Sequence, residues 1–175
     1  DIAGRFYATM QNKFHYAITG HTAAELIVNR VNAYKKDMGL IHKKGEKITR
    51  QEAEVAKNYM FELELRRLEL LVEQFLSFAE LQSIEQRPMY MADWIRKLDE
   101  FIRLNDKLVL TNAGSVSHKH MEQVVNEEYE IYARKLLAEN DPNGDSTFTR
   151  NDFDKALRKV SRPDTDYEDD KTNPN

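Results

Sequence analysis

Apolar side chains recur at helical spacing from the first residues of the chain. Between Ile2 and Thr19 they lie three or four positions apart, which places the following residues on one face of a helix: Phe6, Met10, Phe14, Ala17 and Ile18. Gly20 comes next, and glycine is common just after the end of a helix. The pattern predicts a first helix that ends at about Thr19.

Two sequences that begin with threonine predict further helix starts. Thr22 is followed three residues later by Glu25, and Thr49 by Glu52, which is the spacing of a capping box. The helix after Thr49 is expected to run to about Tyr59. The helix after Thr22 is expected to direct four apolar residues inward: Ala24, Ile27, Val28 and Val31.

Three longer periodic segments follow. The first, roughly 62–86, has an apolar stripe in steps of four and three: Phe61, Leu65, Leu68, Val72, Phe75 and Ala79. Pro88 separates it from a second helix that reaches about Asn105, with Met91, Trp94, Ile95, Leu98, Phe101 and Ile102 at helical spacing. Ser117 is a suitable N-cap for a third, which extends through Asn140 and has Met121, Val125, Tyr129, Tyr132 and Leu136 on one side.

The chain has no sustained alternation of apolar and polar residues, and a last short amphipathic helix is expected over 151–160. We therefore predict an all-α fold, with a single bundle of about six to seven helices over residues 1–160. Residues 161–175 form an acidic tail that should be disordered.

Composition narrows the classes of function. The chain has no cysteine, which excludes disulfides, thiolate metal sites and cysteine nucleophiles. Its net charge of −4 gives the whole chain no electrostatic footprint for nucleic acid. No apolar run approaches the ~20 residues that span a bilayer, so we expect a cytoplasmic protein with no membrane partner. Because the chain starts at Asp1 without an initiator Met, we expect it to be a fragment of a larger polypeptide.

The segment from Asp141 to Asp152 resembles a 12-residue EF-hand loop. Oxygen donors that could bind Ca²⁺ or Mg²⁺ occur at the positions such a loop uses: Asp141, Asn143, Asp145, Thr147 (through its carbonyl), Thr149 and Asp152. Ser146 replaces the usual turn glycine, and Asp152 replaces the bidentate glutamate. These departures favour the alternative, an acidic turn whose Asp and Asn side chains cap the neighbouring helices.

Other polar residues have both a surface and a functional interpretation. Residues 35–48 contain two glycines and no periodicity, which predicts a loop. From Lys35 to Arg50 the chain has six basic residues and only two acidic ones. This basic loop could contact phosphates, but we favour a solvated loop. Leu40 and Ile41 in it are expected to pack back on the bundle or onto a partner. In His118-Lys119-His120 the two histidines project in different directions from a helix, which favours surface or capping roles over a metal site.

Several long blocks resemble the RhuM family of bacterial virulence-associated proteins. The most specific is FYATMQNKFHYAITGHTAAE, residues 6–25. Further blocks follow in the family's order and extend the resemblance over roughly residues 5–137: 38–40, 55–59, 88–94, and 112–114 with Ser117-His118. The resemblance implies the C-terminal, helical part of a protein whose N-terminal half is expected to bind DNA. It supplies no catalytic residues.

Two functions from different classes follow. Because no nucleophile, base and oxyanion donors cluster in the sequence, we favour a non-catalytic interaction or oligomerisation domain that binds a protein partner or itself. The stripe from Phe61 to Ala79 motivates this interpretation. The alternative is a Fic-like enzyme that handles nucleotides or phosphate through His21 and the basic loop. A pocket that joins His21, Glu25 and the basic loop would favour the enzyme, whereas a broad apolar face would favour the partner.

Overall fold

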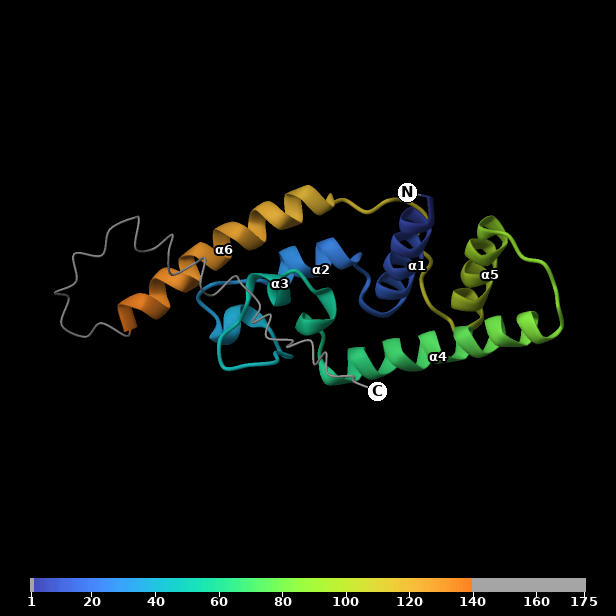
Figure 1. Cartoon of the computed structure of the whole chain (residues 1–175), viewed down its shortest axis with the longest axis horizontal. Helices are drawn as coiled ribbons and strands as arrows, with labels where there is room; N and C mark the ends of the chain where they lie inside the picture. Colours follow the sequence, from blue (N-terminus) through green and yellow to red (C-terminus); the bar gives the residue numbers. More distant parts are fainter. Residues whose placement is uncertain (1, 140–175) are drawn as a thin grey trace, which may run out of the picture. The chain divides into compact units, whose positions relative to one another are not determined.

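The computed structural model describes residues 2–139, which form an all-α structure. The described residues contain six α-helices, two 3₁₀ helices and no β-strand (Figure 1). The chain divides into two units, one up to Tyr132 and one from Ala133. Of the second unit, the described residues only continue the last helix to Glu139. The predicted EF-hand-like loop, the helix over 151–160 and the acidic tail lie outside the described residues.

The first helix ends and the second helix begins where the sequence predicts. α1 spans Ile2–Thr19 and α2 spans Ala23–Arg30. The capping box at Thr22 is present, because the Glu25 amide donates to the Thr22 hydroxyl and the Thr22 amide donates to the Glu25 carboxylate. The inward face of α2 agrees with the prediction only in part, since Ile27 and Val31 are buried as expected. Leu26 and Ile27 are its buried residues, while Ala24 and Val28 are only half-buried, because the helix is covered on a side rotated towards Leu26.

The segment after α2 contains short helical pieces. The 3₁₀ helix η1, Lys36–Gly39, lies within the predicted loop, and Asp37 and Met38 both have positive φ there. The capping box at Thr49 is confirmed, but the continuous helix to Tyr59 is wrong. α3 covers only Arg50–Ala53, and a separate 3₁₀ helix, η2, covers Ala56–Tyr59. Val55 between them adopts an extended conformation, which directs Tyr59 into the interior, where its hydroxyl donates to the Ala53 carbonyl at 2.9 Å.

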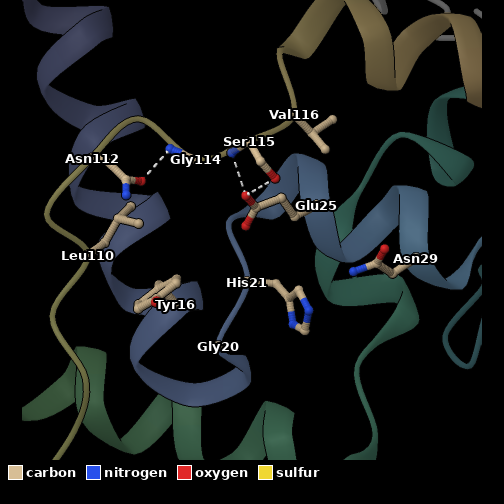
Figure 2. Close-up of a pocket in the computed structure, with 10 residues that line it drawn as sticks. All are labelled: Tyr16, Gly20, His21, Glu25, Asn29, Leu110, Asn112, Gly114, Ser115 and Val116. Carbon is tan, nitrogen blue, oxygen red and sulfur yellow. Dashed lines mark hydrogen bonds between the residues drawn. The ribbon is translucent and has the colours of Figure 1, made fainter.

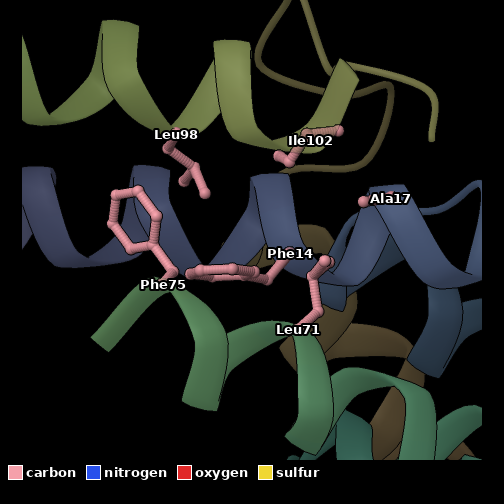
Figure 3. Close-up of a cluster of buried hydrophobic side chains, with 6 residues drawn as sticks. All are labelled: Phe14, Ala17, Leu71, Phe75, Leu98 and Ile102. Carbon is pink, nitrogen blue, oxygen red and sulfur yellow. The ribbon is translucent and has the colours of Figure 1, made fainter. Parts of the chain in front are cut away.

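An apolar cluster joins α1 to two later helices, α4 (Glu62–Ile84) and α5 (Met91–Leu104). Six buried side chains form its centre (Figure 3): Phe14, Ala17, Leu71, Phe75, Leu98 and Ile102. The Phe75 ring packs against Phe14 and Trp94 with centroid distances of 5.9 and 6.1 Å, both edge to face. The predicted stripe of α4 is only partly correct: Phe75 is buried and Leu68 and Val72 are half-buried, but Phe61 is 60% exposed.

An ion pair ties the start of α4 to α2. The Arg30 guanidinium donates two hydrogen bonds to the Glu64 carboxylate, each 2.6 Å long, and a third to the Tyr59 carbonyl. Its Cζ also lies 4.8 Å from the centroid of the Phe61 ring. One guanidinium thus contacts three groups near the start of α4, namely the Tyr59 carbonyl, the Phe61 ring and the Glu64 carboxylate, and these contacts hold the start of α4 against the end of α2.

The last described helix, α6, spans His118–Glu139 and begins as predicted, with the His120 amide donating to the Ser117 hydroxyl at 3.2 Å. The buried stripe is Met121, Val125 and Tyr129. The Tyr129 hydroxyl donates to the Ile48 carbonyl at 3.2 Å. No helix among the described residues is long and apolar enough to cross a membrane.

Candidate functional site

A polar pocket of about 490 Å³ lies where the end of α1, the start of α2 and the segment before α6 meet (Figure 2). It has the size of pockets that bind small molecules. The described residues that line it come from two separate sequence regions: Tyr16, Gly20, His21, Glu25 and Asn29 from the first, and Leu110, Asn112, Gly114, Ser115 and Val116 from the second.

The turn between α1 and α2 forms one wall of the pocket. Gly20 has φ +73° and its amide donates to the Tyr16 carbonyl at 2.9 Å, which closes α1. The chain then reverses into α2, whose first amide, that of Ala23, donates to the Asn12 side chain at 3.1 Å. His21, Glu25 and Asn29 follow at intervals of four residues, so that they lie on the same side of α2 and its approach.

Glu25 connects this turn to the segment before α6. Its Oε2 accepts from the Thr22 amide at 2.7 Å, and its Oε1 accepts from the Ser115 amide and hydroxyl at 2.6 and 2.7 Å. One carboxylate thus caps α2 and holds a residue 90 positions further along the chain. We call these contacts of Glu25 with Thr22 and Ser115 the clasp.

The close approach within the clasp depends on Gly114. Its φ is +85°, and a Cβ atom there would lie 2.7 Å from Thr22 Cγ2 and 3.2 Å from Glu25 Oε1. Asn112 fixes the turn, because its side-chain oxygen accepts from the Gly114 amide at 2.9 Å. Only glycine therefore fits at position 114, where the segment before α6 approaches Thr22 and Glu25, without a shift of the backbone.

A buried lysine positions the other end of the same segment. Lys13 of α1 donates to the Leu110 carbonyl at 2.7 Å, and its Nζ lies 2.8 Å from Asp99 Oδ1 in α5. The Asp99 contact is an ion pair whose angles do not meet hydrogen-bond geometry, since Oδ1 is buried without a hydrogen-bond partner. Lys13 thereby carries a charge into the interior with an acidic partner beside it.

The protonation state of Glu25 limits its chemistry. Burial raises the pKa of Glu25, but the hydrogen bonds from the backbone and side chains of Ser115 and Thr22 outweigh it and lower the pKa to about 2. A carboxylate this weakly basic does not deprotonate a serine hydroxyl. Although Ser115 donates to Glu25, the contact does not activate Ser115 as a nucleophile, and Glu25 stays negatively charged at neutral pH.

His21 presents one ring nitrogen to the pocket. Its Nδ1 lies 2.9 Å from the Thr19 carbonyl oxygen. Since a carbonyl only accepts hydrogen bonds, Nδ1 carries the proton, and in the neutral ring Nε2 is a hydrogen-bond acceptor. The described residues provide no partner for Nε2. His15, the other histidine near this turn, has a buried Nδ1 without a partner, and burial lowers its pKa.

The basic loop does not contribute to the pocket. Among the described lining residues there is no lysine or arginine. Lys43 pairs with Asp37 at 2.7 Å and Arg50 with Glu54 at 3.0 Å. Leu40 is buried, so the loop packs back as expected, whereas Ile41 is 41% exposed. The pocket joins His21 to Glu25 but lacks the phosphate-binding cations that the enzyme alternative requires.

The remaining candidate residues lie apart from the pocket. His118 and His120 are exposed at the start of α6, and His118 Nε2 lies 3.9 Å from Glu122. Within residues 2–139 no group of three or more His, Cys, Asp or Glu side chains is placed to hold a metal ion. The EF-hand-like ligands, from Asp141 to Asp152, fall outside the described residues, so a site for Ca²⁺ or Mg²⁺ there stays a prediction.

The sequence predicts the separate segments of this site but not the contacts between them. Thr22 and Glu25 were predicted as a local cap, and the block 112–114 was noted separately. No signal within one sequence links Glu25 to Ser115. The contribution of Lys13 was also missed, because a lysine on a helix is usually solvated.

Comparison with known proteins agrees with the resemblance. The family model described as the virulence protein RhuM family matches residues 1–140. No curated protein and no solved structure matches the chain significantly.

Proposed function

Because the chain belongs to the virulence protein RhuM family, we propose that it serves this family as a non-catalytic helical module that self-associates through α4. The observation that carries the proposal is an exposed apolar surface on this helix. Leu63, Leu70, Leu81 and Ile84 are 60, 39, 50 and 71% exposed. We call these four residues the α4 ridge.

The four residues share one side of the helix. They are separated by seven, eleven and three positions, which at 100° per residue keeps them within an arc of about 60°. This arc lies beside, and not on, the face that Leu71 and Phe75 bury against α1 and α5. Exposed Gln74 and Ser77 lie between Leu70 and Leu81 on this side, so the ridge consists of an N-terminal and a C-terminal apolar pair. Exposed apolar side chains on a helix that already covers the core with another face are typical of an interaction site.

A second copy of α4 is the partner that the charges along the ridge favour. Arg66 lies near the N-terminal end of the ridge and Glu80 near its C-terminal end, and both are exposed. If two copies pair antiparallel, Arg66 of each helix lies opposite Glu80 of the other. In a parallel pair each of these charges would face its own copy. Antiparallel pairing also makes the contact self-complementary under two-fold symmetry.

The chemistry of the pocket supports a non-catalytic role. Glu25 is held in three hydrogen bonds and is too weakly basic to serve as a general base. His21 Nδ1 donates to a backbone carbonyl and not to a carboxylate, so the ring lacks the acidic partner that orients the histidine of a catalytic triad.

Two leucines of α4 give a matched test of self-association. Leu81→Glu places a charge in the ridge, whereas Leu76→Glu places the same charge at a position that is 61% exposed but outside the arc. Analytical ultracentrifugation of the whole chain should show a dimer whose dissociation constant rises at least about tenfold in Leu81→Glu and is unchanged in Leu76→Glu. A monomeric wild-type chain, or equal weakening by both variants, would contradict the proposal.

An activity assay tests the non-catalytic part separately. The chain should transfer no adenylyl group and hydrolyse no nucleotide. If it does either, and His21→Ala abolishes that activity, the module is an enzyme, whatever its oligomeric state.

DNA binding, which the family resemblance implies, is assigned under this proposal to sequence N-terminal to this chain. The net charge of −4 supports the assignment. The chain alone should bind duplex DNA weakly, without sequence preference and with strong dependence on salt, through the basic loop. A tight, sequence-selective gel shift at physiological salt would contradict the assignment.

A further inference from the structure

Besides donors such as the Asn112 amide nitrogen and the Tyr16 hydroxyl, the pocket contains hydrogen-bond acceptors on its α2 side. His21 Nε2 is one, since Nδ1 donates to Thr19. Glu25 Oε2 is another, because it accepts one bond from Thr22 and a carboxylate oxygen can accept two. Figure 2 shows this oxygen on the side of Glu25 that faces His21, away from the bonds to Ser115. Asn29, one turn along α2, has an exposed amide whose nitrogen lies on the side of His21 in Figure 2, and rotation of this side chain brings its oxygen there as a further acceptor.

The net charge of the pocket is negative. Glu25 is the one lining residue, among those described, that carries a full charge at neutral pH when His21 is neutral. With no lysine or arginine lining it, the pocket has no group to compensate a phosphate or carboxylate ligand. An anion would therefore lose its hydration without gaining an ion pair.

The remaining walls are apolar. Leu110, Val116 and the ring of Tyr16 line the pocket beside these acceptors, and Figure 2 shows Tyr16 and Leu110 on the side opposite His21 and Asn29. Such walls suit the hydrocarbon part of a small molecule. A ligand with a donor-rich head and a short apolar body would use both kinds of surface.

We propose that this pocket binds an organic cation, a ligand whose ammonium or guanidinium group donates hydrogen bonds to Glu25, His21 and Asn29 while its apolar part contacts Tyr16 and Leu110. A metal ion is a poorer fit, because no third His, Asp or Glu converges there among the described residues. The inference does not depend on self-association through α4, because the lining residues belong to α1, α2 and the segment 110–116 and none belongs to α4.

The test uses three probes of similar shape and different charge: butylguanidinium, butylurea and pentanoate. The first two differ chiefly in the charge and in the additional N–H donors of guanidinium. In ¹H–¹⁵N spectra of the whole chain, butylguanidinium should shift the amide signals of Gly114 and Ser115 and the ring signals of His21. It should bind at least about tenfold more tightly than butylurea, since charged hydrogen bonds are stronger. Pentanoate should shift none of these signals.

Two variants locate the binding site without disturbing the clasp. His21→Ala and Asn29→Leu each remove one acceptor and should weaken butylguanidinium binding several-fold. His118→Ala, at an exposed histidine outside the pocket, should leave it unchanged. If His21→Ala does not fold, Asn29→Leu alone decides the question, because the Asn29 side chain is exposed. Equal binding of butylurea, binding of pentanoate, or insensitivity to Asn29→Leu would overturn the proposal.

Discussion

The apolar cluster around Phe75 and the clasp around Glu25 each join parts of the chain that are far apart in the sequence, but by different means. In the cluster, aromatic and aliphatic side chains from α1, α4 and α5 are packed together with no polar partner required. At the clasp, one carboxylate accepts hydrogen bonds from two backbone amides and one hydroxyl, and the close approach of Gly114 leaves no room for a Cβ atom there. Packing depends on volume and tolerates apolar exchange. The clasp depends on donor and acceptor identity and tolerates almost none.

Phe75→Ala should produce the largest loss of stability. The ring lies at the centre of four aromatic contacts, with Phe14, Phe78, Trp94 and Phe101. Its removal leaves a cavity that should cost about 3–5 kcal/mol of unfolding free energy. Leu76→Ala, on the exposed side of the same helix, should change it by less than about 0.5 kcal/mol. Urea denaturation followed by circular dichroism measures both, and similar losses would show that Phe75 is not central.

Gly114→Ala should have the next largest effect and tests the clasp where it is tightest. The new Cβ combines the strain of a positive φ with a clash against Thr22, for an expected loss of about 2–3 kcal/mol. Gly20→Ala provides the control, because Gly20 also has positive φ but has nothing within 4 Å of its Cβ position. It should lose only about 1 kcal/mol. Equal losses in thermal unfolding would mean that strain alone, and not close approach, explains Gly114.

Glu25→Gln should be milder in size but distinctive in its pH dependence. An amide in place of one carboxylate oxygen faces a backbone donor, and should cost about 1–2 kcal/mol near neutral pH. In the wild type the folded-state pKa of Glu25, about 2, lies below its ordinary value of 4.5. Its contribution is therefore complete above about pH 4.5 and is lost as pH falls towards 2. The variant should show a shallower decline in stability over that range. An unchanged slope would argue against the clasp.

A smaller pH effect is expected at His15. Burial lowers the pKa of His15 below 6.5, so the folded state disfavours the charged ring. The unfolded state then binds more protons, and the stability should decrease as pH falls below about 6.5. His15→Phe should reduce this dependence, whereas His118→Phe, at an exposed position, should preserve it. Chemical denaturation at several values between pH 5 and pH 8 compares the three proteins.

The smallest effect concerns neither region. If residues 141–152 bind Ca²⁺ or Mg²⁺, the site should be weak, in the millimolar range of low-affinity loops, because Asp152 reaches less far than the usual glutamate. Calorimetric titration of the chelator-stripped chain, beside Asp141→Ala, measures it. Absence of heat at several millimolar of either ion would leave only the capping-turn interpretation.

The cluster and the clasp also differ in how much of them the sequence predicts. The period of Phe14, Leu98 and Ile102 identifies core positions, because burial of a helix face repeats along the chain. The capping boxes at Thr22 and Thr49 were predicted because all of their partners are local. The break at Val55 was not, since tertiary burial of Tyr59 overrides a helical pattern over a few residues. The bonds from Ser115 to Glu25 join residues whose spacing carries no period.

The hydrogen bonds between Glu25 and Ser115 also close a long loop of the chain non-covalently. The two residues are 90 positions apart, and the segment between them includes the basic loop and the α4–α5 hairpin. For a flexible loop, the entropy of closure depends on the logarithm of length, so that even a doubling costs about 0.6 kcal/mol. The side chains of the turn from Gln86 to Tyr90 are almost all exposed. Insertions or deletions in this turn should therefore change the free energy of folding only slightly. The geometry around His21 and Glu25 would stay the same while the hairpin changed in size.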